Sequence, residues 1–306
     1  MTSKKFLYKV MLSGLFIVPA LACNHNDKVS PDYVSEIMKL RQRHIDYLKS
    51  DTGWLNLAGL YWLDEGENSF GSDSSDKIIF PQKAPAHIGT LILDSGNVRV
   101  RITPGVVVTS GGRPVHDTLL IPDTEKGTTV LKSGPLVWFV IRRGLQTGIR
   151  LRNLEHPAVQ ALDTIPAWPV DPAWRIKAKF VPFSSPKKVQ IPNVLGTTFE
   201  STSPGMLYFT VNRKQYSLQP TGRPEHLSLV FADETSSGRE SYGGGRFLEV
   251  DGPDQKGNYY IDFNKAYNPP CAFTPYATCP LPMRENILPF TVTAGEKTDP
   301  AWHGHK

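Results

Sequence analysis

Residues 257–290 read GNYYIDFNKAYNPPCAFTPYATCPLPMRENILPF, and this stretch decides how the rest of the chain is interpreted. Alternation over 259–263 predicts a short strand. The prolines that follow, from Pro269 to Pro289, remove backbone donors and restrict φ, so regular structure should end there. A long ordered loop rich in polar and aromatic residues is more often a site than a connector. The stretch therefore predicts either a binding site or a rigid cap on one end of a β domain.

Polar side chains at both ends of this loop are the candidate site residues. Asp262 and Glu285 are candidate catalytic carboxylates, because two carboxylates in different environments can divide acid and base roles. Asn264, Tyr267 and Asn268 would line the wall of such a site. The alternative is that Asp262 and Glu285 are structural carboxylates that cap loop amides.

A glycine run upstream supplies a second part of the candidate site. Residues 241–246 read SYGGGR, in which successive glycines let backbone N–H groups converge beside an arginine. Tyr242 and Arg246 are therefore candidate ligand-binding residues for a carboxylate or phosphate. In the alternative interpretation Arg246 is paired with Asp262 or Asp233.

The two cysteines of the loop, Cys271 and Cys279, lie eight positions apart. In an oxidising compartment a disulfide is the first expectation, and buried free thiols are the second. Zinc is disfavoured because four-coordination needs two more ligands, and a nucleophilic thiol would need a base. We expect no metal and no cofactor, and no hydrolase, metalloprotease or nucleotide-binding motif is visible in the sequence.

Working outward, the 25 glycines and 26 prolines divide the chain into short segments, which favours a β-rich architecture. The segment Trp54–Leu63 is the most apolar part of the expected mature chain and is expected in the core, with an aromatic ligand pocket as the alternative. A hairpin of 247–250 with 259–263 would place Arg246 beside Asn264. Strands are expected at 78–80, 90–93, 98–102, 106–108, 118–121, 136–141, 175–181, 206–211, 215–218, 227–231, 247–250, 259–263 and 287–293.

Residues 65–143 resemble a forkhead-associated (FHA) domain, a β-sandwich that reads phosphothreonine. The shared landmarks are the turn at 71–72, the strand at 76–80, His87, the turn at 111–112 and residues 130–134. Ser72 stands where that family has its phosphate-gripping arginine, Ala84 where it has a serine, and Gly111 where it has an asparagine. The resemblance therefore implies a sandwich that does not bind phosphothreonine peptides.

The start of the chain predicts where in the cell the protein is located. Lysines at 4, 5 and 9, an apolar run from 11 to 22 and then Cys23 are typical of a secretory signal followed by a lipid-modified cysteine. A plainly secreted protein is the alternative. Without residues 1–22, which carry three lysines and no acids, the net charge falls from +5 to +2. Such a charge gives no reason to expect nucleic acid as a partner.

The expected organisation is mainly β with one N-terminal amphipathic helix, on which His44 is expected to be solvated. The parts are a signal at 1–22, a tether at 23–29, the helix at 30–50, an FHA-like sandwich at 54–153, a linker at 154–174, a second β-rich unit at 175–296 and a tail at 297–306.

Several motifs together resemble one bacterial and archaeal family, domain-of-unknown-function family 1684, over roughly residues 40–296. They are GWL at 53–55, GLYWL at 59–63, GEN at 66–68, FGS at 70–72, PAWR at 172–175, Tyr242 with GRFL at 245–248, and DFNKAYNPPCAF at 262–273. The resemblance implies family membership and no activity.

These observations lead to one functional hypothesis and one alternative. We expect an envelope lipoprotein, held to a membrane by its lipid anchor only, that binds a small molecule or glycan fragment where the Gly243–Arg246 turn meets the 262–286 loop. Hydrolysis is a further candidate activity of that site. The alternative is a non-catalytic structural or protein-interaction module.

Overall fold

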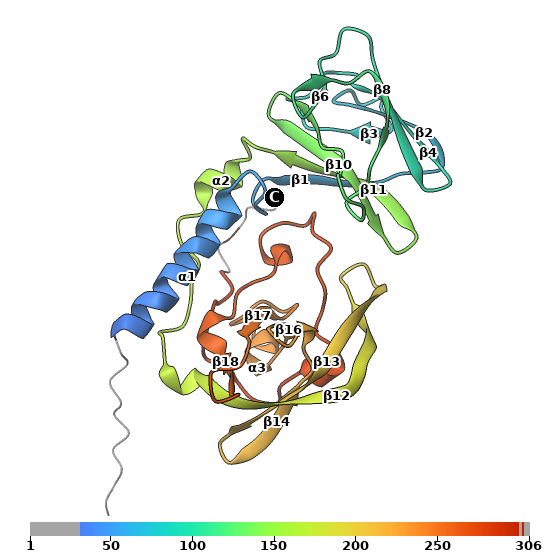
Figure 1. Ribbon diagram of the computed structural model, residues 1–306. Coiled ribbons are helices and arrows are strands. Elements are labelled where there is room, and N and C mark those ends of the chain that lie inside the picture. Colours follow the sequence, from blue (N-terminus) through green and yellow to red (C-terminus); the bar gives the residue numbers. More distant parts are fainter. Residues whose placement is uncertain (1–30, 300–301, 303–306) are drawn as a thin grey trace, which may run out of the picture.

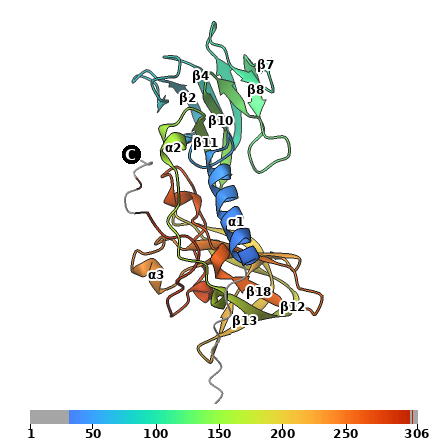
Figure 2. The ribbon, with the colours of Figure 1, turned by 90° about the vertical axis from the view of Figure 1, so that its left-hand side faces the viewer.

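The computed structural model describes residues 31–299 and Trp302, and the expected signal segment and Cys23 lie outside this part of the chain. The protein is mainly β, as the sequence predicted. Its strands form two β-rich units, each with its own hydrophobic core, and one long helix runs beside both (Figures 1 and 2).

The first unit is a β-sandwich of a five-stranded sheet, ordered β3-β2-β4-β5-β8, and a six-stranded sheet, ordered β1-β11-β10-β9-β6-β7. Alternate residues of both sheets point inward, and Phe70, Phe80 and Trp138 contact one another edge-on between them. The strands are β1 (Leu57–Trp62), β2 (Gly66–Gly71), β3 (Ile78–Ile79), β4 (Gly89–Asp94), β5 (Asn97–Ile102), β6 (Thr109–Ser110), β7 (Arg113–Pro114), β8 (Asp117–Leu120), β9 (Leu131–Ser133), β10 (Leu136–Arg143) and β11 (Gln146–Asn153).

The second unit combines a four-stranded sheet, ordered β14-β13-β12-β18, with a three-stranded sheet, ordered β15-β16-β17. Phe209, Phe231 and Phe263 join the two sheets in one core. The strands are β12 (Arg175–Pro192), β13 (Thr198–Val211), β14 (Lys214–Leu218), β15 (Thr221–Arg223), β16 (His226–Phe231), β17 (Arg246–Asp251) and β18 (Tyr259–Asp262), with the short helix α3 (Glu234–Ser237) between β16 and β17.

Two strand predictions in this unit are wrong. The predicted hairpin of 247–250 with 259–263 does not form, because β17 pairs with β16 and β18 pairs with β12. Residues 287–293 do not form a strand and make a single bridge, between Ile287 and Ala232. Alternation identifies residues that suit a strand, but the choice of partner depends on packing that a local pattern does not contain.

Helix α1 (Pro31–Lys49) begins with proline at its first position, where a missing N–H costs nothing. Ile37, Ile45 and Leu48 form its buried stripe. Near its C-terminal end it packs against α2 (Pro157–Ala161), the short helix in the proline-rich connection between the two units. No helix among the described residues is long and apolar enough to cross a membrane.

The outer half of the β12–β13 hairpin, residues 187–203, extends beyond a bulge as a two-stranded ribbon. Its tip meets the proline-rich loop, where the Val194 N–H bonds the Cys279 carbonyl at 3.0 Å and the Leu281 N–H bonds the Pro192 carbonyl at 2.7 Å. The ribbon and the loop thus form one continuous wall above the three-stranded sheet.

Candidate functional site

The proline-rich loop is fixed at both ends by backbone contacts. Tyr267 and Phe247 exchange two backbone hydrogen bonds of 2.9 Å, so the start of the loop joins β17. The loop then passes through the short turns η3 (Pro270–Ala272) and η4 (Arg284–Asn286). The Glu296 N–H bonds the Ala266 carbonyl at 2.9 Å, which places the end of the second unit beside the start of the loop.

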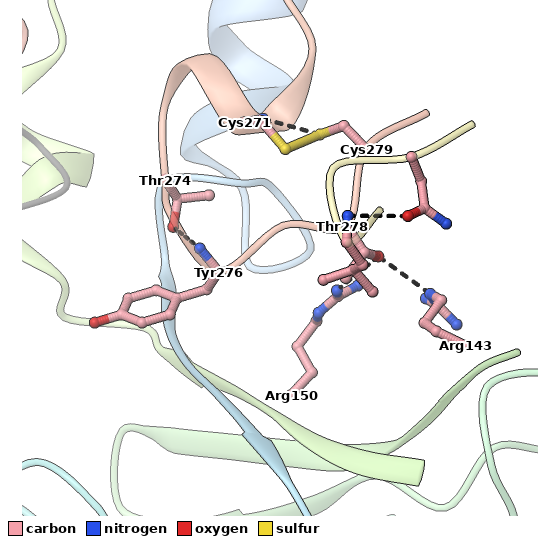
Figure 3. Close-up of a disulfide and its surroundings, with 9 residues drawn as sticks. Arg143, Arg150, Cys271, Thr274, Tyr276, Thr278 and Cys279 are labelled. Atoms are coloured by element: carbon pink, nitrogen blue, oxygen red, sulfur yellow. Dashed lines mark hydrogen bonds between the residues drawn. A yellow bond between two sulfur atoms is a disulfide. The ribbon is translucent and has the colours of Figure 1, made fainter. Parts of the chain in front are cut away.

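Cys271 and Cys279 form a disulfide that closes the middle of the loop (Figure 3). Thr278, next to the disulfide, accepts hydrogen bonds from Arg143 Nε at 3.1 Å and Arg150 Nη2 at 3.3 Å. These arginines belong to β10 and β11, so the disulfide-closed segment lies against the first unit. Burial, and then the charge of Arg143, lowers the pKa of Arg150 to about 10.

Arg246 is placed in the core, and its prediction as a ligand-binding residue is wrong. Its side chain is 0% exposed and Nη2 donates to Asp233 Oδ2 at 2.6 Å and to the Val292 carbonyl at 3.1 Å, while Nη1 donates to the Ala294 carbonyl. Burial lowers the pKa of Arg246, and the charge of Asp233 opposes that shift. Arg246 lies in the core because side chains alternate between the two faces of a strand, and residues 246, 248 and 250 of β17 point inward.

Asp262 and Glu285 do not form a pair. Asp262 is 4% exposed and accepts hydrogen bonds from the Tyr33 hydroxyl at 2.8 Å and the Asn264 N–H at 3.2 Å. In the antiparallel ladder of β18 and β12, Asp262 lies opposite Arg175, the first residue of β12. Glu285 is exposed and lies beside residues 189–192, near the other end of β12. A strand rises about 3.3 Å per residue, so the two carboxylates are far apart.

Three of the four remaining predicted residues of the loop and turn also have structural partners. Asn264 is buried and donates to the Asp171 carbonyl at 2.8 Å. Asn268 is buried, with its N–H bonded to Glu296 Oε2 at 2.8 Å and its side chain bonded to the Lys297 carbonyl at 2.9 Å. Tyr242 is half-buried with its ring against Gly244.

Tyr267 is the predicted residue that lines two neighbouring cavities. The first, here called the polar cleft, has a volume of about 530 Å³ between α1, β17 and the start of the loop. Its walls combine aromatic rings with charges of both signs. They are Leu40, Arg43, His44, Tyr47, Trp54, Glu249, Asp251, Lys265 and Tyr267.

The second cavity, here called the apolar chamber, has a volume of about 290 Å³ under the ribbon and the loop. Its lining is mostly hydrocarbon. It comprises Ile191, Phe199, Ser201, Gln219, Thr221, Ser228, Leu229, Val230, Phe247, Glu249, Tyr267, Pro280, Leu281, Met283 and Asn286. Glu249 and Tyr267 belong to both cavities, so the cleft and the chamber are direct neighbours.

His44 is the residue that the sequence interpretation missed. It was expected to be solvated, but its side chain is 10% exposed and its Nδ1 lies 2.7 Å from Glu296 Oε1. Nε2 is buried and has no hydrogen-bond partner among the described residues. The signal was its position seven residues after Ile37 and four before Leu48, which lies on the buried stripe of the helix. Its charged partner is 252 positions away and could not be read from the helix.

A ring of aromatic side chains holds the His44 imidazole. Its ring centroid lies 5.0 Å from that of Tyr267 and 5.8 Å from that of Trp54. Glu296 accepts the Asn268 N–H with its second oxygen, which fixes the carboxylate that faces Nδ1. A carboxylate on Nδ1 sets the orientation of the ring, and Nε2 stays enclosed and without a partner among the described residues.

Glu249, on the rim between the two cavities, is held by neighbours on β16. The Ser228 hydroxyl donates to Glu249 Oε2 at 2.6 Å, and His226 Nε2 lies 3.2 Å from the same oxygen. Burial, followed by the charges of Glu249 and Glu296, raises the pKa of Tyr267. The Tyr267 hydroxyl therefore stays protonated and able to donate at neutral pH.

In the first unit, residues at the FHA-like landmark positions make hydrogen bonds within the protein itself. His87 Nδ1 is 3.1 Å from Asp76 Oδ2, and the Ser72 hydroxyl donates to the Ala84 carbonyl at 2.8 Å. No cluster of three or more metal-ligating side chains occurs in the described part of the chain.

The solved structures that are similar to this chain superpose on it with low TM-scores. The solution structure of an uncharacterized protein of Haloarcula marismortui is 28% identical, with a TM-score of 0.39, over 46% of this chain and 80% of that one. The FHA domain of FhaA, solved in a complex, is 16% identical, with a TM-score of 0.22, over 30% of this chain and 97% of that one. A further FHA domain, from work on phosphothreonine-dependent FHA interactions, is 16% identical, with a TM-score of 0.22, over 30% and 92%.

A search of curated proteins found no match. The family comparison was positive for residues 160–297, which match the model described as protein of unknown function DUF1684. This segment contains the DFNKAYNPPCAF motif, whereas the motifs at 53–72 precede it. Residues 160–297, which hold the second β-rich unit and most of the connection before it, are therefore similar to the DUF1684 family, in agreement with the motifs of that segment.

Proposed function

We propose that the protein binds a small polyhydroxylated molecule, a glycan fragment, in the polar cleft. One observation carries the proposal, which is the buried Nε2 of His44 in the cleft wall without a hydrogen-bond partner among the described residues. A buried polar atom without a partner costs free energy, and a small rotation of the His44 ring toward the cleft would let a ligand hydroxyl supply the missing bond.

The rest of the cleft supports the same class of ligand. Tyr47, Trp54 and Tyr267 offer flat apolar surfaces with polar edges, which suit the C–H faces of a sugar ring. Lys265 Nζ lies 3.4 Å from Asp251, so part of the charge in the wall is already balanced. Since neither sign dominates, a neutral ligand fits better than a strongly anionic one.

Residues 1–23 suggest where such a ligand would be met. A signal at 1–22 and a lipidated Cys23 would hold the mature protein to a membrane of the cell envelope, where glycan fragments are exposed. Hydrolysis by Asp262 and Glu285 is not part of the proposal, because these residues lie beside opposite ends of β12 and are far apart.

The test is isothermal titration of the full mature chain with a panel of neutral monosaccharides and disaccharides. We expect at least one to bind with a dissociation constant below about 1 mM, and His44→Gln to weaken that binding at least about tenfold. Gln42→Ala, an exposed change on the same helix, is the matched control and should leave affinity unchanged. Failure of every saccharide to bind would contradict the proposal and favour a non-catalytic structural or interaction module.

A further inference from the structure

The apolar chamber is built from the outward face of the three-stranded sheet. On β16 and β17 residues 227, 229 and 246, 248, 250 point into the core. The intervening side chains Val230 and Phe247 therefore point to the other face and form the chamber floor. Such a face of an antiparallel sheet is usually solvated and polar, so an apolar floor here needs an explanation.

The walls of the chamber are apolar as well. Ile191 and Phe199 come from the ribbon, and Leu281 and Met283 come from the proline-rich loop. Phe199 is 44% exposed although its ring borders the chamber. A concave site lined by such side chains is the usual form of a pocket for an apolar group.

The polar groups of the chamber are mostly engaged with one another. The Asn286 amide donates to the Gln219 carbonyl at 3.0 Å and to the Val230 carbonyl at 3.1 Å. Ser228 donates to Glu249 at 2.6 Å. Since these groups are already paired, the chamber offers a ligand chiefly hydrocarbon surface.

The chamber and the polar cleft share Glu249 and Tyr267 as lining residues. The Glu249 side chain is 38% exposed, so this part of the rim between the two cavities faces solvent. A molecule that lies across this rim reaches both cavities at once, with its polar part toward His44 and its apolar part toward Phe247.

From this arrangement we infer that the ligand is amphipathic, a glycoside whose sugar occupies the polar cleft and whose alkyl or aryl group occupies the apolar chamber. The inference rests on the proposed glycan-binding function and adds the second subsite. A water-sized group takes roughly 30 Å³, so a chamber of about 290 Å³ has room for about nine such groups, which is more than the six carbons of a hexyl chain need.

The experiment compares methyl and hexyl β-D-glucosides, and the corresponding N-acetylglucosaminides, by isothermal titration with the full mature chain. We expect the hexyl glycoside of at least one sugar to bind at least about tenfold more tightly than its methyl counterpart, because burial of methylene groups is favourable. Hexanol alone should bind at least about tenfold more weakly than the hexyl glycoside, since it makes no contact in the cleft.

Two variants locate the gain in the chamber. Val230→Trp fills the chamber and should remove the preference for the hexyl glycoside while methyl glycoside affinity stays within about twofold. Leu119→Trp places the same bulky side chain on an exposed position of β8 in the first unit and should change neither affinity. Phe199→Ala, at the partly exposed wall, should reduce the hexyl preference without the risk of overpacking.

The outcomes separate the two proposals. Equal affinities for methyl and hexyl glycosides would overturn the chamber inference and leave glycan binding in place. A hexyl preference that persists in Val230→Trp would also overturn it, because the apolar group would then bind elsewhere. If neither series binds, the proposed function fails and the chamber inference falls with it.

Discussion

At the scale of single residues, the SYGGGR motif resembled a binding site, but its arginine forms a buried ion pair with Asp233 in the core. Both side chains are 0% exposed, and the same carboxylate accepts the Thr235 N–H at 2.8 Å. Asp233→Asn would leave the Arg246 charge buried without its counterion, and we expect unfolding free energy to fall by about 3–5 kcal/mol. Urea denaturation measures this loss. Glu234→Gln, at the exposed neighbouring position, should change stability by less than about 0.5 kcal/mol, and a similar effect of both changes would contradict the prediction.

Asp254 gives a prediction for pH. Hydrogen bonds from the Asn258 side chain, and then from the Asn258 N–H, lower the pKa of Asp254 from 3.8 to about 2. Because the folded pKa lies below the unfolded one, the stabilisation is present above pH 3.8 and is lost as pH falls through about 2. An NMR titration of the carboxyl carbon should show this midpoint, and Asn258→Ala should move it back toward 3.8. A normal midpoint in the unmodified protein would refute the assignment.

The difference between Tyr267 and His44 shows what residue patterns can and cannot reveal. Tyr267 was a candidate because the loop around it is unusual, and it does line both cavities. His44 looked like an ordinary residue of an amphipathic helix. Its partner Glu296 lies 252 positions away, at the end of the second unit. Contacts of such long sequence separation are not encoded in any local pattern.

At the scale of elements, the sequence located many strands and did not identify their partners. The helix at 30–50 and the hairpin of 206–211 with 215–218 match α1 and the β13–β14 pair closely. Short loops force such neighbours together, so proximity in sequence was enough. β17 and β18 are also neighbours in sequence, but each pairs with an earlier strand. The register of a whole sheet depends on which faces are buried, and that information is distributed along the chain.

The prediction for this element concerns the loop that the Cys271–Cys279 disulfide closes. Replacing both Cys271 and Cys279 by serine should lower the unfolding free energy by about 2–3 kcal/mol in the chain-entropy model. It should also speed hydrogen exchange between residues 272 and 278, while the Tyr267 N–H, bonded to Phe247, stays protected. Thr278→Val keeps the disulfide and removes the acceptor for Arg143, so it separates the crosslink from the contact with the first unit. Unchanged exchange in the double variant would show that the prolines alone order the loop.

At the scale of the whole molecule, the two units, the helix and the loop meet around the cavities. Trp54 comes from the start of the first unit, His44 from α1, and Glu249 from the second unit. The cleft can therefore form only when all three parts are docked. The sequence identified one wall, the 262–286 loop, because its proline and aromatic content stands out. The other walls come from ordinary-looking strands and helix, which only the assembled fold brings together.

The proposed location in the cell envelope leads to a prediction for the mature chain. If residues 1–22 are removed and Cys23 is acylated, intact-mass spectrometry should show a chain that begins at Cys23 with the added mass of a lipid. Cys23→Ser should release the protein from the membrane fraction and leave its glycan affinity unchanged, since the cleft residues lie between 40 and 267. A mature chain that begins at another residue would contradict lipidation and favour simple secretion.

The first unit resembles a phosphothreonine reader in its order of landmarks, and the atoms around those landmarks predict that it does not act as one. Recognition of a phosphate needs a cation and several aligned donors. The position of the gripping arginine is taken by Ser72, whose hydroxyl already donates to the Ala84 carbonyl and whose N–H bonds the Pro85 carbonyl at 3.0 Å. Gly111 has no side chain to donate, and His87 faces Asp76. Reaching a phosphate would require breaking these bonds with no charge gained in return.

A phosphothreonine peptide array probed with the mature chain should therefore give no phosphate-dependent signal at micromolar protein, while an FHA domain probed in parallel gives clear spots. Any peptide that binds should bind its unphosphorylated form equally well. Phosphate-dependent binding in the micromolar range would mean that cations elsewhere on the sandwich, such as Arg99 or Arg101 on β5, have replaced the missing arginine. Both of these already lie near Asp117, at 2.6 Å and 3.8 Å, so their charge is partly neutralised and the replacement is not expected.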